Sequence, residues 1–482
     1  MPESVSAESG KPMDLMAYTS LGGNPDMIMS AKWGRTEAAV NPKTGKKQAG
    51  QTSAIVANST NPGDHQIGFK RIDALLKAPD LAPAQKKKLE DFVIRTAGFA
   101  VDSPGFRDIP APKTLDDAKN VIAKVKDRMA KNLLSIYDAV PTPVKNYWQR
   151  WYPLAYDWNN AQSVIHKIPA PAIAGINARL SPGKDWIHNV NMTERILKAF
   201  SNKISMTEEI ANGAGPILDE ALREKLKSKD NKAKPQEWKD EQARKNELAK
   251  KQIRSTIGMN IEDMTPKQAA RLIRFHSQVV GENRVFNYFE KGNPVYADAI
   301  SWQSFVNLEK SINIYRNPTI ENISANMGGD HKIRSFYNNQ IAPHDPVLRD
   351  VTSDTHAVAA TYLLPLSQKS LQVSRNFGGA SNSVAGMNGM YYIIADAYRM
   401  AADARGVEPR AMQSITWEGV RSMFPRGFKQ KENIKKVEEI WKRTESQEIT
   451  KPQALIEINA LMIDFFSKNP DSRPRVTVIP TI

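Results

Sequence analysis

The sequence predicts a mostly α-helical protein of two or three domains. The chain has 482 residues and an ordinary apolar fraction of 40%, which is enough for a packed core. Apolar residues recur three and four positions apart in segments such as "IGFKRIDALLKA" and "PAQKKKLEDFVIRTAG", as they do on one face of a helix. Strand signals are few, and neither an internal repeat nor a regular alternation of strands and helices is present.

Composition and periodicity divide the chain into four predicted regions. Residues 1–66 are rich in Gly, Ser, Asn, Pro and Thr and predict a polar, flexible N-terminal region. Residues 67–140 predict accessory helices, among them a long amphipathic helix for which Thr114 is a suitable N-cap. Residues 141–428 predict the helical core, and residues 429–482 predict a helical tail.

Capping residues place individual helices within the predicted core. Thr265 followed by Pro266 opens a helix, because threonine accepts a bond from the first turn and proline suits the first helical position. Gly406 ends the helix "MYYIIADAYRMAADARG", and Pro409 opens the next one. Residues 144–160 mix aromatic residues with Arg and Asn, a composition found both in cores and in surfaces that stack bases.

A charged insertion is expected within the core. Residues 220–254 contain twelve Lys and Arg against seven Asp and Glu. Such a run predicts a solvated helical hairpin between core helices, and it also suits non-specific contact with phosphates.

The overall charge favours a polyanionic partner. The formal net charge is +15 and the pI is about 9.5, values typical of proteins that bind nucleic acid, although a basic surface without a special role has the same totals. The sequence contains no stretch of eighteen apolar residues, so it predicts no membrane span. The N-terminus lacks the features of a secretory signal, and the absence of cysteine fits a cytoplasmic or virion protein.

The residue types present exclude several kinds of site. The chain has no cysteine, so disulfides, thiolate metal sites, iron–sulfur clusters and cysteine nucleophiles are excluded. Its seven histidines are scattered without the spacing of a zinc site. The sequence therefore predicts no metal and no cofactor.

The stretch "VTSDTHAVAATYL" places a carboxylate and an imidazole where an apolar helix begins. Asp354 or Thr355 is expected to cap this helix by accepting a backbone N–H bond from its first turn. The alternative is that Asp354 is a catalytic carboxylate held at a helix N-terminus. His356 is a candidate to orient a substrate or to act as a general base.

Three segments together resemble the helix-hairpin-helix DNA glycosylase superfamily. "AGINARLSPGKDWIHNVNMTERIL" is similar to its early core helices, "ISANMGGDHKIRSF" resembles its DNA-gripping hairpin, and "VTSDTHAVAA" resembles the segment with its catalytic aspartate. Their order agrees with the family, and Lys332 precedes Asp354 by 22 residues. The chain also resembles phage proteins built around "KIRSFYNN", "TSDTHAVAA" and "MQSITWEGVR".

This resemblance implies a glycosylase-like helical core that binds DNA. It implies that Asp354 is catalytic and that Lys332 is a Schiff-base nucleophile, the alternatives for Lys332 being a phosphate contact or a solvated surface lysine. The implied DNA-binding residues are Gly328, Gly329, Lys332 and Arg334. The hairpin departs from the family, because its two glycines are adjacent and Asp330 stands where the second glycine is usual.

Polar residues in two later apolar helices are candidates for the wall of a substrate pocket. Asp396 and Arg399 lie on one helix face. The next helix places four polar or aromatic residues within two turns: Gln413, Trp417, Glu418 and Arg421. The alternative is a buried network that joins Asp396–Arg399 with Glu418–Arg421. Asn189 and Lys184, after the Ser-Pro break, are further candidates for lining this pocket.

Two functions are consistent with these features. The first is a phage-associated DNA-binding enzyme that removes or remodels a flipped, possibly modified base. The second is a non-enzymatic DNA-binding or virion-associated structural protein on the same scaffold. The resemblance and the retained Asp354 segment favour the first, whereas the altered hairpin and the long polar N-terminal region favour the second.

Overall fold

The computed structural model describes residues 83–469, apart from 282–283, 291–292, 301, 328–330 and 378–388, together with residues 73, 76, 77 and 79. The described chain is mostly helical, which confirms the predicted fold class. The region predicted as flexible, residues 1–66, lies outside the described residues.

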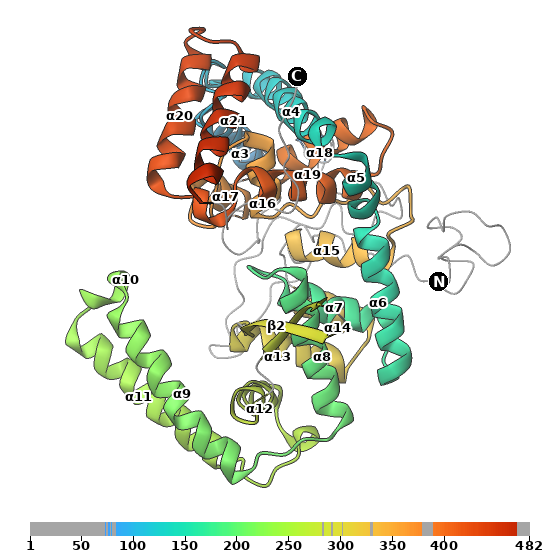
Figure 1. Cartoon of the computed structure of the whole chain (residues 1–482), viewed down its shortest axis with the longest axis vertical. Coiled ribbons are helices and arrows are strands. Elements are labelled where there is room, and N and C mark those ends of the chain that lie inside the picture. Colours follow the sequence, from blue (N-terminus) through green and yellow to red (C-terminus); the bar gives the residue numbers. More distant parts are fainter. Residues whose placement is uncertain are drawn as a thin grey trace, which may run out of the picture. The chain divides into compact units, whose positions relative to one another are not determined.

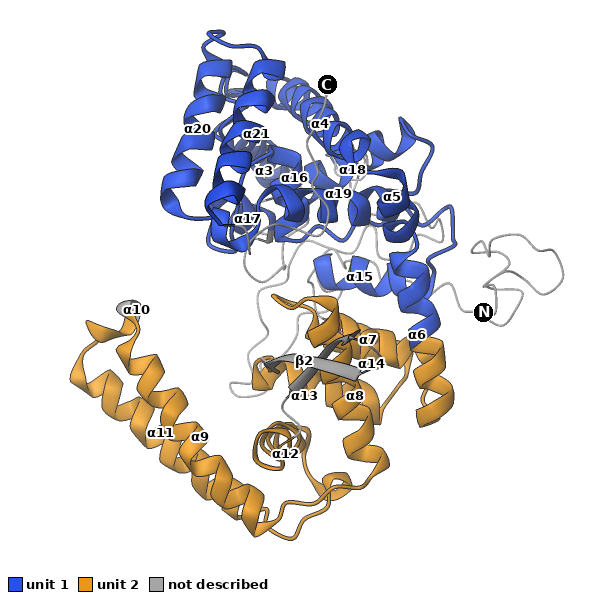
Figure 2. Cartoon of the chain, in the orientation of Figure 1, with its two compact units in different colours: residues 1–158, 328–482 blue, residues 159–327 orange. Residues whose placement is uncertain are grey.

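The chain forms two compact units (Figure 2). Unit 1 combines Met1–Trp158 with Gly328–Ile482, and unit 2 is Asn159–Met327. This division differs from the predicted one, because the helices expected to be accessory and the expected tail share a unit with the second half of the core.

Unit 1 contains most of the helices (Figure 1). They are α3 (Pro83–Val101), α4 (Leu115–Ala139), α5 (Thr142–Trp148), the first half of α6 (Trp151–His166), α15 (His331–Ile341), α16 (Thr355–Tyr362), α17 (Leu371–Phe377), α18 (Met390–Asp403), α19 (Pro409–Met423), α20 (Lys431–Glu445) and α21 (Lys451–Lys468). A 3₁₀ turn, η4 (Arg426–Phe428), precedes α20.

Helix α4 is central to unit 1, which explains why the predicted boundary at residue 140 differs from the observed one. The helix begins at a capping box formed by Thr114 and Asp117, as expected for Thr114. Its apolar stripe, which includes Val125 and Met129, is fully buried against α3, α16, α18 and α19. These helices form one hydrophobic core, so residues from both ends of the chain stabilise the same unit.

Unit 2 is built from shorter core helices and a long hairpin. Its elements are α7 (Ala170–Leu180), α8 (Trp186–Ser201), α9 (Glu208–Lys227), α10 (Lys229–Lys232), α11 (Gln236–Arg254), η3 (Ile261–Asp263), α12 (Pro266–Val279), β1 (Arg284–Glu290), β2 (Asn293–Ala299), α13 (Phe305–Arg316) and α14 (Ile320–Met327). The two strands pair antiparallel with each other. Thr265 caps α12 with Pro266 at its first position, as the sequence predicts.

The charged insertion forms a helical hairpin, as predicted. Helices α9 and α11 pack along each other, and Figure 1 shows them extending away from the other helices of unit 2. Most side chains of α11 are exposed, and Ile253 is its fully buried residue. The hairpin begins earlier than expected, because Thr207 caps α9.

Candidate functional site

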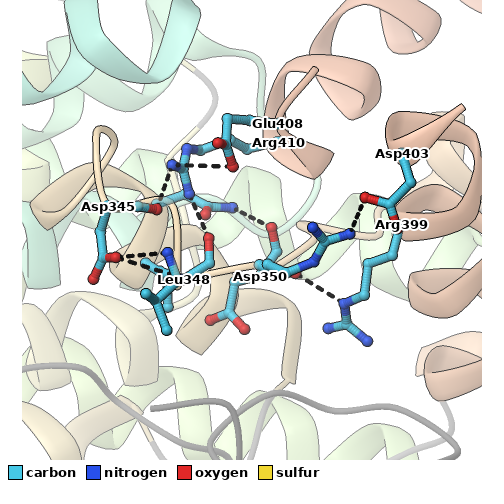
Figure 3. Close-up of polar contacts among 10 residues, drawn as sticks. Asp345, Leu348, Asp350, Arg399, Asp403, Glu408 and Arg410 are labelled. Atoms are coloured by element: carbon cyan, nitrogen blue, oxygen red, sulfur yellow. Dashed lines mark hydrogen bonds and ion pairs between the residues drawn. The ribbon is translucent and has the colours of Figure 1, made fainter. Parts of the chain in front are cut away.

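The segment that leads to Asp354 has no regular secondary structure, and one buried and one partly buried arginine bind its carbonyl groups (Figure 3). Arg410, 3% exposed, donates hydrogen bonds to the carbonyl oxygens of Leu348 at 2.6 Å and Asp345 at 2.7 Å. Arg399 donates through Nε to the carbonyl oxygen of Arg349 at 2.9 Å. These bonds satisfy polar groups that would otherwise be buried without partners.

The last residues before Asp354 are held by α15 and α18. The Tyr391 hydroxyl donates to the carbonyl oxygen of Val351 at 2.7 Å and accepts from the Ser353 N–H at 3.2 Å. The Asn339 amide donates to the carbonyl oxygen of Asp350 at 3.2 Å. Asp354 is therefore presented by a backbone that is fixed on several sides.

Asp354 is the N-cap of α16 and also contacts α19. Its Oδ1 accepts the N–H of Ala357 at 2.9 Å, and its Oδ2 accepts the indole Nε1–H of Trp417 at 2.9 Å. The side chain is only partly buried. The first turn of α16 and the indole of Trp417 thus each hold one oxygen of the carboxylate. The capping role that the sequence predicts is present, and the contact to Trp417 is additional.

His356 lies beside this carboxylate against the same indole. The ring centroids of His356 and Trp417 are 5.2 Å apart in an edge-on arrangement. The pKa of His356 is lowered to about 4, chiefly by burial, against the opposing effect of Asp354 and with smaller contributions from Lys429 and Arg421. The imidazole is therefore neutral at pH 7. Its Nδ1 is buried and has no hydrogen-bond partner among the described residues.

Lys429, which sequence reasoning missed, completes this group. It follows the η4 turn, and burial lowers its pKa to about 8, against the opposing effect of Asp354. Asp354, His356, Trp417 and Lys429 are hereafter the Asp354 cluster. Groups with strongly shifted pKa values that share a partly exposed position are candidates for function. No local signal distinguishes Lys429 from the other lysines, because its surroundings come from distant segments.

An aromatic surface continues from the cluster. The ring centroids of Trp417 and Trp148 are 5.8 Å apart, and those of Trp148 and Tyr147 are 5.6 Å apart. The Arg421 guanidinium lies 5.2 Å from the Trp417 ring centroid. Tyr147 is 61% exposed, so the aromatic surface reaches solvent. These rings come from α5 and α19.

Two further candidates on α19 have different surroundings. Gln413 is buried, and its Oε1 accepts the hydroxyl of Tyr152 at 2.8 Å. Burial raises the pKa of Glu418, and Arg421 opposes this effect at a distance of 3.7 Å. Helix α19 thus brings Gln413, Trp417 and Glu418 into the same unit as Asp354.

Asp396 and Arg399 are ion-paired on α18. Arg399 contacts Asp396 at 2.9 Å, and Lys126 of α4 contacts the other carboxylate oxygen at 3.1 Å. Glu418 and Arg421 pair with each other and have no ion pair with Asp396 or Arg399 among the described residues. The predicted network is therefore two separate pairs. The Asp396–Arg399 pair also links α18 to α4, because Lys126 of α4 contacts Asp396.

The residues nominated by the hairpin resemblance are described only in part. Gly328, Gly329 and Asp330 lie outside the described residues. Lys332 is on α15 with its ammonium 5.3 Å from the Phe336 ring centroid. Asp354 has no ion pair with Lys332 in the described part of the chain, and Arg334 is buried.

Asn189 and Lys184 belong to unit 2. Asn189 lies on α8, is almost fully buried, and donates to the carbonyl oxygen of Asn177 on α7 at 2.9 Å. Burial lowers the pKa of Lys184, which precedes α8. In unit 2 the amide of Asn189 therefore links α7 to α8.

Two general properties accompany this geometry. Along the described residues, no helix combines the length and apolarity that a membrane span requires. The same residues include no group of three or more His, Asp or Glu side chains arranged to hold a metal ion.

No curated protein and no solved structure shows significant similarity to the chain. A family model does match it, over residues 116–235 and 303–423, which together make up half of its length. The matched segments contain α4, the segment that presents Asp354, and Trp417. The chain therefore belongs to the family of unknown function DUF7178.

Proposed function

We propose that this protein binds DNA and that the Asp354 cluster receives a base turned out of the double helix, on which the protein acts. One observation carries the proposal: a partly exposed carboxylate is fixed between a helix N-terminus and the indole N–H of an aromatic surface. Carboxylates that assist base removal have to be held beside the sugar.

The aromatic surface supports binding of a flat heterocycle. Bases stack on tryptophan and tyrosine rings regardless of sequence, and arginine strengthens such stacking. Trp417, Trp148 and Tyr147 provide the rings, and Arg421 provides the cation.

The chemistry of the cluster supports hydrolysis of the bond between base and sugar. In this reaction the oxygen of a water molecule bonds to the sugar carbon while the bond to the base breaks, and its electron pair leaves with the base. Asp354 accepts the proton of the water molecule. Within the cluster His356 is neutral and Lys429 is a cation, so Asp354 is the group that can accept this proton.

The net charge supports DNA as the partner. The chain has a formal net charge of +15, and binding to phosphates with release of counterions favours a cationic protein. Exposed cations of the α9–α11 hairpin, including Lys234, Lys251 and Arg254, suit non-specific phosphate contacts.

The test is a panel of duplexes with normal and modified bases, analysed by mass spectrometry for a released or altered base. The wild-type protein is expected to change at least one duplex, and Asp354→Asn is expected to lower that rate by roughly 10²–10⁴. Asp464→Asn, an exposed change on α21, is the matched control. Full activity of Asp354→Asn would remove this residue from the mechanism.

A second candidate is a DNA-binding or virion-associated protein without catalysis. The observation that favours it is that both carboxylate oxygens of Asp354 already accept hydrogen bonds within the protein. In this case the protein would retard DNA at low salt and leave every duplex of the panel unchanged. Asp354→Asn would then affect stability alone.

A further inference from the structure

A second feature of unit 1 is a pocket of about 370 Å³ away from the Asp354 cluster. It lies between α4, the end of α20, the start of α21 and the turn around Gly105. Phe106, Tyr362 and Trp441 are buried aromatic residues of its lining, and the first two pack edge to face with centroids 5.2 Å apart. Its size suits a small organic molecule.

Most charges around this pocket are already paired. Arg128 binds Asp108 through two contacts, at 2.5 and 2.7 Å, and also donates to the carbonyl oxygen of Gly105 at 2.7 Å. Glu445 accepts the N–H of Gly105 at 2.5 Å and that of Arg107 at 3.2 Å. These bonds fix the turn and leave neither Arg128 nor Glu445 in need of a ligand.

Three lysines also line the pocket, and they differ in their partners. Lys131 pairs with Asp127 at 2.8 Å. Lys124 is exposed, so water satisfies its ammonium. Lys451 is partly buried, and its ammonium has no carboxylate or carbonyl partner in the described part of the chain.

The surroundings of Lys451 reinforce its demand for an anion. It is the first residue of the 18-residue helix α21, where the helix dipole adds positive potential. Its pKa is lowered to about 8, chiefly by burial and then by Arg128 and Lys131, while Asp127 opposes them. Lys451 therefore stays mostly charged at pH 7, although the protein offers it no counterion.

We propose that this pocket binds a small organic anion, with its oxyanion group on Lys451 and its organic group in the rest of the pocket beside Trp441. A phosphate monoester and a carboxylate share this chemistry. An oxyanion supplies the acceptors that Lys451 lacks, and Trp441, held by its indole N–H on the carbonyl oxygen of Leu363 at 3.2 Å, supplies a rigid face.

Thermal unfolding of the full chain with inorganic phosphate, adenosine monophosphate or benzoate tests the proposal. At least one organic anion is expected to raise the Tm and to bind Lys451→Met roughly 10- to 100-fold more weakly, because a bond to a charged group is lost. Lys468→Met, at the exposed end of the same helix, is expected to bind like the wild type. A response to adenosine monophosphate indicates a phosphate ester, and a response to benzoate indicates a carboxylate.

Lysine labelling gives an independent readout. Reductive methylation followed over pH by peptide mass spectrometry is expected to show half-modification of Lys451 near pH 8, and a bound anion should raise this midpoint. Lys451→Met is expected to fold with unchanged or higher stability, because it removes a buried charge without a partner. The proposal is wrong if no anion raises the Tm, if Lys451→Met binds as tightly as the wild type, or if the midpoint for Lys451 equals that for Lys468.

Discussion

At the scale of single residues, the two oxygens of Asp354 have different partners, and an asparagine can replace only one of them. Its single side-chain oxygen either caps Ala357 or accepts from Trp417, whereas its NH₂ group faces the other donor. Sequence alone suggests a nearly silent Asp354→Asn change, because asparagine is a good cap. The bond to Trp417, formed across 63 residues of sequence, changes that expectation.

Asp354→Asn is therefore expected to lower the free energy of unfolding by about 1–2 kcal/mol. Trp417→Phe removes the indole donor, so in that variant Asp354→Asn should lower the free energy of unfolding by a smaller amount. Urea unfolding of the wild type, both single variants and the double variant measures the coupling. Additive effects would mean that the bond contributes nothing to stability.

His356 is expected to make stability pH-dependent. Its pKa is about 4 in the folded protein and about 6.5 in the unfolded chain. Between these values the unfolded chain binds a proton that the folded protein does not, so stability falls as the pH drops from 6.5 to 4. The loss is roughly 1–3 kcal/mol after allowance for partial exposure. His356→Phe should flatten this part of the pH profile, measured by urea unfolding; an unchanged slope would contradict the assigned pKa.

At the scale of elements, the start of α18 depends on a glycine. Gly389 has φ +77°, and a Cβ atom there would lie 2.4 Å from the Phe92 ring and from Thr96 Oγ1 of α3. Gly406, after the same helix, has φ +63° with open space around it. At both positions the left-handed backbone would strain any residue with a Cβ atom, but only Gly389 is also crowded by neighbouring side chains.

Gly389→Ala is expected to destabilise unit 1 by roughly 2–4 kcal/mol, because left-handed strain and a clash with α3 add up. Gly406→Ala is the matched control and should cost only about 1–2 kcal/mol of strain. Thermal unfolding of both variants gives the comparison. Equal losses would show that α3 gives way to the added methyl group.

How far the sequence predicts the structure differs from one element to another. Helix starts at Thr114, Thr265 and Asp354 were predictable, because capping depends on residues three positions apart. The neighbours of Asp354 from distant segments, such as Lys429, were not predictable, because only tertiary packing brings them close to Asp354. The predicted boundary at residue 140 is displaced for the same reason: periodicity shows that α4 has an apolar face, but not what covers it.

At the scale of the whole molecule, charge governs the expected binding to DNA. The affinity should fall steeply with salt, since each neutralised phosphate contributes about −0.9 to the slope of log affinity against log salt. Combined Lys234→Glu, Lys251→Glu and Arg254→Glu changes on the hairpin are expected to reduce this slope. Lys87→Glu with Lys468→Glu, at exposed positions of α3 and α21, is the control. Gel retardation over a salt series measures both, and a slope independent of the hairpin changes would exclude it from the interface.

The path of the chain through its two units has a consequence for synthesis on the ribosome. Helix α4 ends at Ala139, and its partner α18 begins about 250 residues later, at Met390. Unit 2 lies wholly between them and is complete when Met327 emerges. The part of the α4 stripe that α18 covers, unlike the part against α3, therefore stays uncovered while an entire unit is made, and at about 5–20 residues per second that delay is on the order of 10–50 seconds. Since exposed apolar surface of this kind favours chaperone binding, we expect the folding yield of unit 1 to depend on chaperones more than that of unit 2.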